Sequence, residues 1–212
     1  MDQYSLTGDF FLHPTPAGAY HAVSRPTTDA ARHLIRRLLR SRETPRLTPQ
    51  LMSSWLGLDE QQSLQFVYRL QTSGLLQGLP VQVEVPPERI EALLPPLLAQ
   101  MCDSGQALLS DKRGLYIGKA GYAHETAEEL AALAADLAAV HERHSRLLHG
   151  NLGLRSDGWG MIGASGYSEI GFWPLHFGDD YFILVASGTP RFNQEAFTTL
   201  LWILGVRYGS VS

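Results

Sequence analysis

Hydrophobic positions follow a helical period most clearly between residues 126 and 149. Large apolar side chains at spacings of three and four predict one stripe on this helix: Leu130, Leu133, Leu137, Val140 and Leu147. Small side chains form a second stripe: Ala131, Ala134, Ala135 and Ala138. We expect the leucine stripe to face the core. The alanine stripe reflects either the high helix propensity of alanine or a second packing face, which the same helix of another subunit would cover.

The residues at the two ends of this helix are those that helix ends favour. Thr126 can cap the first turn, and Glu129 has the spacing that completes a capping box. Arg143 and Arg146 lie in the last turns, where the negative end of the helix dipole favours cations. Gly150 can end the helix.

Shorter apolar runs predict the elements around this helix. They are a helix over 88–101, a hairpin over 106–121, strands over 168–173 and 181–186 joined at Gly178-Asp179-Asp180, and a last helix capped by Asn193. An extra strand is expected near 159–162. Residues 88–212 therefore have the predicted order α-β-β-α-β-β-α.

The first 86 residues predict a different arrangement. Residues 9–24 have the pattern of a hairpin, because prolines and Gly18 separate two apolar runs. Amphipathic helices are expected over 28–42, 48–57 and 59–74, followed by extended chain over 75–85. Helices followed by strands in this order are typical of a winged helix. Because Pro86 and Pro87 stop the last strand, we predict an α+β protein with domains at 1–86 and 87–212.

A winged helix raises the question of DNA binding. The second helix of the pair would expose Gln61, Gln65 and Arg69, and the first offers Arg36 and Arg40, so these five residues are candidate contacts to DNA or a protein partner. Phosphate neutralisation needs several cations. The net charge is +1 over residues 1–86 and −5 over 87–212. The charge therefore favours a protein-binding or structural winged helix over a DNA-binding one.

Composition narrows the class of protein. The formal net charge of −4 gives no attraction to anionic membranes or nucleic acid. Cys102 is the one cysteine, so no intrachain disulfide is possible. No apolar run approaches the ~20 residues of a membrane helix, and the N-terminus lacks the pattern of a signal peptide. We expect a cytoplasmic protein.

Candidate chemistry is sparse in the sequence. The densest group of metal-ligating side chains is His141, Glu142, His144 and His149. The zinc-protease pattern needs two residues between Glu and His, whereas here only Arg143 intervenes. We interpret these histidines as groups at the negative end of the helix dipole. No catalytic residue, metal or cofactor is predicted.

The second half resembles a known family. Residues 109–117, a hairpin with a polar turn, are followed by the Glu-, Ala- and Leu-rich residues 128–134. This order is similar to the roadblock domain of dynein light chain type, which also occurs in bacterial partners of small Ras-like GTPases. The resemblance extends over roughly residues 88–206. It implies a roadblock-like α/β sandwich, in which helices flank a central antiparallel sheet. It also implies a non-enzymatic scaffold or regulator of a small GTPase or another protein, which dimerises through its central helix and an edge strand. The alternative is a transcriptional regulator whose winged helix binds DNA.

Physical reasoning also favours a homodimer. An unpaired strand edge recruits another strand, and a two-fold axis would make residues 168–173 pair with themselves. Alternatively, Phe172 and Trp173 fill their own core. The predicted interface consists of eight residues: Ala131, Ala134, Ala135, Ala138, Ser168, Ile170, Phe172 and Trp173.

Overall fold

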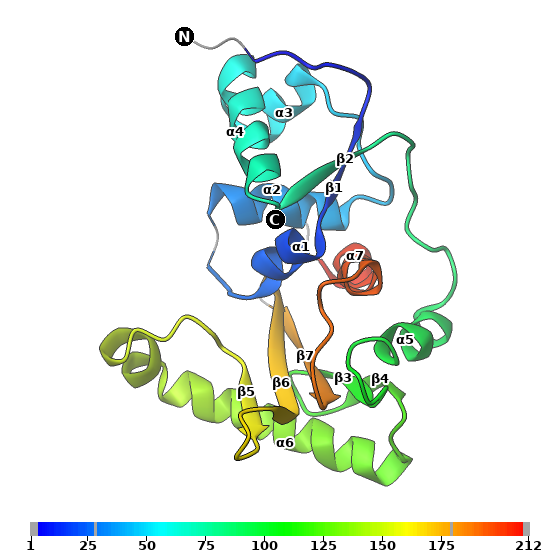
Figure 1. The fold of residues 1–212 in the computed structure, drawn as a ribbon, viewed down its shortest axis with the longest axis vertical. Coiled ribbons are helices and arrows are strands. Elements are labelled where there is room, and N and C mark those ends of the chain that lie inside the picture. Colours follow the sequence, from blue (N-terminus) through cyan, green and yellow to red (C-terminus); the bar gives the residue numbers. More distant parts are fainter. Residues whose placement is uncertain (1–3, 28, 179, 210–212) are drawn as a thin grey trace.

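The computed structural model describes residues 4–27, 29–178 and 180–209. Helices from the N-terminal half lie at one end, a long helix lies at the other end, and a sheet stands between them (Figure 1). Thr28 and Asp179, which the sequence places at a helix start and a turn, lie outside the described residues. Among the described helices, none has the length and apolar character needed to cross a membrane.

A five-stranded antiparallel sheet forms the centre of the C-terminal half. Its strand order is β4-β3-β7-β6-β5. The strands are β3 (Ala107–Asp111), β4 (Tyr116–Ala120), β5 (Trp159–Ile162), β6 (Ser168–Phe177) and β7 (Asp180–Ser187). The predicted hairpin and the extra strand are therefore confirmed. The expectation that residues 168–173 form a sheet edge is wrong, because β5 pairs with β6 and takes the edge position.

The two faces of the sheet belong to two different cores. On β3, Leu108 packs under the long helix, whereas Leu109 points to the opposite face. Ile183 and Leu184 of β7 divide in the same way, as the two-residue period of a strand requires. Helices α5 (Ile90–Leu98) and α7 (Glu195–Tyr208) cover the larger core together with part of the N-terminal half.

The long helix α6 (His124–Arg143) turns its alanines toward the sheet. Ala127, Ala131 and Ala134 are buried against strand residues such as Phe172 and Ile183. Our expectation that the leucine stripe faces the core is wrong for three of its members, Leu133, Val140 and Leu147, which are exposed. Leu130 and Leu137 are half-buried and do pack against this core. Small side chains allow the helix backbone to approach a sheet surface that already carries bulky residues.

The ends of α6 also differ from the prediction. The helix begins at His124, before Thr126, and its N-cap residue Ala123 makes no side-chain capping bond. The prediction of a capping box at Thr126 and Glu129 is therefore wrong. After Arg143 the α-helix gives way to a π-helical segment, η1 (Arg146–Asn151). This wider turn changes the direction in which the last side chains point.

The N-terminal half contains the predicted helices but not the predicted hairpin. Helices α2 (Ala30–Arg40), α3 (Pro49–Leu56) and α4 (Glu60–Thr72) lie close to their expected positions. The hairpin over residues 9–24 is wrong: β1 (Phe11–Pro14) leads into α1 (Pro16–Val23). The Thr15 hydroxyl accepts the Gly18 N–H at 3.0 Å, and Pro16 occupies the first helical position. Strand β1 pairs instead with the distant β2 (Leu76–Leu79).

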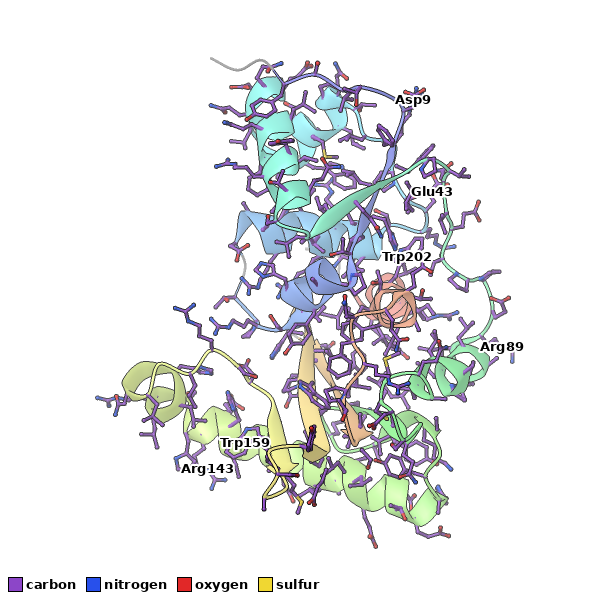
Figure 2. The ribbon with its side chains drawn as sticks, viewed as in Figure 1. Asp9, Glu43, Arg89, Arg143, Trp159 and Trp202 are labelled. Carbon is purple, nitrogen blue, oxygen red and sulfur yellow. The ribbon has the colours of Figure 1, made fainter. Side chains whose placement is uncertain are left out.

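One continuous hydrophobic core crosses the predicted boundary at residues 86–87. The α7 residue Trp202 donates its indole N–H to the Ser41 carbonyl at 2.6 Å and packs edge-on against His13. Figure 2 shows Trp202 where α7 meets the N-terminal elements. We therefore expect the two halves to unfold together.

His13 makes the stability of this junction depend on pH. Burial lowers the pKa of His13 from 6.5, although the charge of Glu195 acts in the opposite direction. The imidazole of His13 is therefore protonated at a higher pH in the unfolded chain than in the folded chain. As a result, the free energy of unfolding falls as the pH drops through 6.5. We expect His13→Gln to reduce the slope of unfolding free energy against pH between about pH 7 and pH 5. Urea titrations at a series of pH values measure this slope, and an unchanged slope would contradict the assignment.

Candidate functional site

A cavity of about 770 Å³ opens beside the C-terminal end of α6. Its walls come from α6, from the segment that follows α6, and from residues 25–27 between α1 and α2. The C-terminal end of β6 and the N-terminal end of β7 complete them. The ionisable side chains on its walls are Arg25, His141, Glu142, His149, Arg155, Asp157, His176 and Tyr181. Elements from both halves of the sequence thus build one concave surface.

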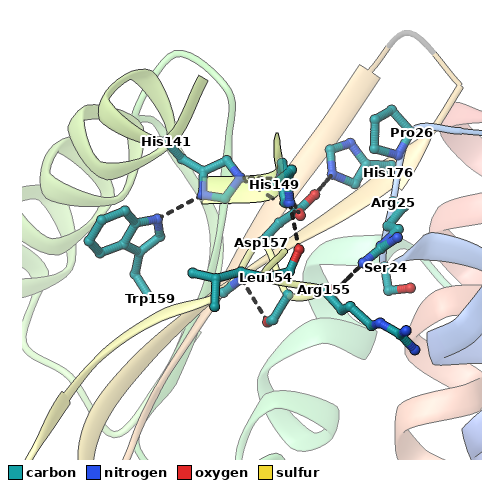
Figure 3. Close-up of polar contacts among 12 residues, drawn as sticks. Ser24, Arg25, Pro26, His141, His149, Leu154, Arg155, Asp157, Trp159 and His176 are labelled. Atoms are coloured by element: carbon teal, nitrogen blue, oxygen red, sulfur yellow. Dashed lines mark hydrogen bonds and ion pairs between the residues drawn. The ribbon is translucent and has the colours of Figure 1, made fainter. Parts of the chain in front are cut away.

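Three histidines and one aspartate converge on this cavity (Figure 3). The Nε2 atoms of His141 and His149 lie 3.0 Å apart. Asp157 Oδ1 is 3.3 Å from His149 Nε2 and 3.7 Å from His141 Nε2. The other oxygen, Asp157 Oδ2, is 3.5 Å from His176 Nε2. The side chains of His141, Asp157 and His176 are at most 14% exposed, so the cluster is largely withdrawn from solvent.

Each member of the cluster comes from a different local structure. His141 lies in the last turn of α6, and His149 lies in the π-helical η1 segment. Asp157 precedes β5, and His176 lies near the end of β6. The sequence pattern indicated His141 and His149 together with Glu142 and His144, interpreted as groups at a helix end. It missed Asp157 and His176, which carry no periodic signal and lie in other segments.

Hydrogen bonds define which ring nitrogen carries the proton in neutral His141 and in neutral His149. The Trp159 indole N–H donates to His141 Nδ1 at 3.1 Å, so the proton of neutral His141 is on Nε2. That proton points to His149 Nε2 at 3.0 Å. His149 Nδ1–H in turn donates to the Leu154 carbonyl at 2.9 Å. When both rings are neutral, each of these three hydrogen bonds therefore has one N–H donor and one acceptor.

Burial and charge act together on the ionisable groups. Burial lowers the pKa of His141, and the neighbouring His149 and His176 lower it further, against the effect of Asp157. Burial alone would raise the pKa of Asp157, but His176, His141 and His149 outweigh it and leave the pKa lowered. The lowered pKa values favour neutral His141 and ionised Asp157, which are the forms in which these two groups bind cations.

Two atoms of the cluster are buried without a hydrogen bond. Asp157 Oδ1 and His176 Nε2 each have less than 1 Å² of accessible surface and no hydrogen-bond partner within the described chain. A buried carboxylate oxygen without a donor is costly, and native proteins rarely leave one unpaired. The chemistry of this donor set, imidazole nitrogen plus carboxylate oxygen, suits a transition-metal ion.

The predicted interface residues divide between the interior and the surface. Ala131 and Ala134 of α6 are buried against the sheet together with Phe172, and Trp173 packs against Phe192 on the opposite side of the sheet. Ala135, Ala138, Ser168 and Ile170 are half-buried. The exposed apolar residues of this region are instead Leu133 and Val140 on α6 and Met161 and Ile162 on β5, at 44%, 36%, 62% and 70%. We call these four residues the α6–β5 surface.

The predicted contacts to DNA or a partner also divide. Arg36 is buried and donates to the Ala22 carbonyl at 2.8 Å, so it cannot reach an external ligand, and its assignment as a contact is wrong. Gln61 is exposed and bonds to the backbone of Tyr4, and Arg40 is half-buried. Gln65 and Arg69 remain exposed on α4. Nothing in this arrangement adds support for DNA binding.

Comparison with known proteins gives structural matches only. No family model and no curated protein matches the chain. The chain is similar to a roadblock/LC7 domain from Streptomyces avermitilis, with 16% identity, coverage of 57% of this chain and 93% of that chain, and a TM-score of 0.36. It is also similar to MglB of Myxococcus xanthus, with 20% identity, coverage of 55% and 88%, and a TM-score of 0.34. The gliding protein MglB of Thermus thermophilus is 20% identical, with coverage of 55% and 82% and a TM-score of 0.32.

Proposed function

We propose that this chain is a non-enzymatic scaffold that forms a homodimer and binds a small Ras-like GTPase. The observation that carries the dimer is the α6–β5 surface, where apolar side chains lie exposed beside the free edge of the sheet. The resemblance of residues 109–117 and 128–134 to roadblock domains supplies the class of partner.

The free edge of β5 supports pairing between two copies. One side of β5 bonds to β6, and no strand among the described residues pairs with its other side. Two β5 strands that pair across a two-fold axis satisfy each other, since each copy offers the same edge. The two sheets would then continue into one another.

The outer face of α6 supports the same contact. Trp159 of β5 bonds to His141 of α6, and Met161, two residues further on, shares the side of the strand that faces α6. Leu133 and Val140 are seven residues apart and lie on one face of the helix. A second copy paired along β5 would cover these apolar groups, which water otherwise solvates unfavourably.

Leu133→Glu tests the dimer. Burial of a carboxylate against the partner helix is strongly unfavourable, so we expect the dimer dissociation constant to rise at least about 100-fold. Sedimentation equilibrium over a concentration series measures it. Val81→Glu is the matched control, because it introduces the same charge at an exposed apolar residue between β2 and α5 and should leave dimerisation unchanged.

Two results would overturn the dimer. One is a wild-type chain that sediments as a monomer up to high micromolar concentration. The other is a Leu133→Glu chain that keeps the wild-type mass.

Binding of a GTPase is tested separately. We expect the wild-type chain to bind a small Ras-like GTPase encoded by the same organism, and to bind its GDP form and its GTP-analogue form with different affinities. Isothermal titration calorimetry with each form measures this difference. Equal affinities would indicate a scaffold without nucleotide sensing, and failure of every such GTPase to bind in either form would remove this part of the proposal.

A further inference from the structure

We propose that His141, His149 and Asp157 form a binding site for a divalent transition-metal ion of the zinc class. His176 positions the carboxylate of Asp157 rather than binding the ion. The site lies at the end of α6 that borders the cavity, and its ligands are distinct from the residues of the α6–β5 surface. The inference therefore does not depend on dimerisation or on a GTPase.

The separations of the three ligand atoms fit one ion. Zinc holds nitrogen and oxygen ligands at about 2.0–2.1 Å, so the ligand atoms of a tetrahedral site lie roughly 3.3–3.4 Å from one another. The three observed separations are 3.0, 3.3 and 3.7 Å. They bracket this value, so a single ion can reach all three atoms with small movements of the side chains.

The surrounding contacts orient two of the ligands. His149 donates its Nδ1–H to the Leu154 carbonyl at 2.9 Å, which leaves the Nε2 lone pair directed at the cluster. Metal-binding histidines are commonly held in this way by a backbone carbonyl. His176 Nε2 lies 3.5 Å from Asp157 Oδ2, so Oδ1 is the oxygen left for the ion. Asp157 Oδ1 is also the buried atom that has no hydrogen bond within the described chain.

Trp159 opposes metal binding by His141, the third proposed ligand. Its indole N–H donates to His141 Nδ1 and thereby keeps the imidazole proton on Nε2, the atom that would bind the ion. Metal binding requires that this proton move from Nε2 to Nδ1, and the bond to Trp159 is then lost. The affinity of the site is consequently set in part by Trp159, and removal of its N–H should raise that affinity.

The ligand types select the ion, and the cavity leaves room for a further ligand. Imidazole nitrogen favours zinc, cobalt, nickel and copper over magnesium and calcium, which prefer oxygen ligands only. Three protein ligands leave at least one coordination position. That position borders a cavity of about 770 Å³, so water or a small anionic ligand can occupy it.

Metal titration of the full-length chain, with any affinity tag removed, tests the proposal. We expect one Zn²⁺ per chain by isothermal titration calorimetry, no comparable binding of Mg²⁺, and visible d–d absorption when Co²⁺ replaces zinc. Binding should also change the tryptophan fluorescence, because Trp159 contacts a ligand.

Variants then assign the ligands. Asp157→Asn and His149→Gln should each weaken zinc binding by about 100-fold or more, whereas Trp159→Phe should strengthen it several-fold. His144→Gln is the matched control, because His144 is an exposed histidine between α6 and η1 and does not belong to the cluster. Circular dichroism checks that each variant is folded, and the partly exposed His149 offers a variant with little effect on packing.

A comparison of zinc binding by the His149→Gln and His144→Gln variants decides whether the cluster is a metal site. Zinc binding that is lost in His149→Gln and kept in His144→Gln supports the site. Binding that responds equally to both variants, or a wild-type chain that binds no zinc at micromolar concentration, overturns it. A Trp159→Phe chain with weakened zinc binding would remove His141 from the ligand set.

Discussion

Replacement of Gly18 by alanine is expected to lower the free energy of unfolding by about 3 kcal/mol. An added Cβ at Gly18 would lie 1.9 Å from the Leu75 carbonyl oxygen and 2.8 Å from its carbon. Neither backbone can move away easily, because Thr15 N–H donates to the same Leu75 oxygen at 3.2 Å. In an open helix alanine would instead be favoured over glycine by about 1 kcal/mol. The clash therefore reverses the usual effect of this substitution.

Gly150→Ala is the matched control for Gly18→Ala. Outside the local helix backbone, the nearest atom to its added Cβ would be Arg146 Cγ at 3.9 Å, so we expect a change within about 0.5 kcal/mol. Urea unfolding followed by circular dichroism measures both variants. If the two variants were equally stable, the close contact of α1 with the start of β2 would be absent in solution.

The same contact explains why the pattern over residues 9–24 predicted the wrong element. Prolines beside Gly18 are typical of a turn, and nothing within those residues reveals a partner for β1. That partner is β2, more than 60 positions further on, where Leu76 pairs with Pro14. Long-range pairing of this kind leaves no local signal, whereas the helices α2, α3 and α4 have their own period and caps and were predicted close to where they lie.

The period of α6 predicted the helix but not its orientation. Both Leu133 and Ala131 lie on apolar stripes, and periodicity alone cannot say which stripe faces the sheet. The sheet decides, because Phe172 and Ile183 fill the space under the middle of α6, where alanines are buried, and Leu130 and Leu137 pack only at the side of this core. A large side chain such as Leu133 is thereby turned outward, where it forms part of the α6–β5 surface.

Only two of the four residues of the histidine–aspartate cluster were identified from the sequence, for a related reason. His141 and His149 are eight residues apart, and the π-helical segment brings their Nε2 atoms within 3.0 Å of each other. Asp157 and His176 come from the chain before β5 and from β6, so their meeting depends on the tertiary fold. Clusters assembled in this way can be found from the structure and not from spacing.

The wall of the cavity depends on a residue of α2. Arg36 donates to the carbonyls of Ala22, Arg25 and Pro26, which fixes the segment between α1 and α2. Arg25 in turn donates to the Arg155 carbonyl, two residues before Asp157. A buried guanidinium in the N-terminal half thus holds the chain that carries a proposed metal ligand.

Arg36→Met is therefore expected to act on both stability and the site. The variant keeps the apolar stem but removes charge-assisted bonds to one buried and two partly buried carbonyls, so we expect the free energy of unfolding to fall by about 3 kcal/mol. Release of Arg25 should also loosen residues 152–157 and weaken zinc binding several-fold, without the complete loss expected for Asp157→Asn. Urea unfolding and zinc titration, each performed on the same preparation, measure the two effects.

Arg37→Met is the control, because it removes the same charge from the next position of α2. Arg37 is exposed and stacks on the Trp55 ring at 4.5 Å, so its loss should cost less than about 1 kcal/mol and leave zinc binding unchanged. Equal losses of stability in the two variants would show that charge, rather than the bonds to the α1–α2 segment, explains the effect. Wild-type zinc affinity in a destabilised Arg36→Met chain would show that the metal site forms independently of this segment, because its ligands would then be held by α6, η1 and β5 alone.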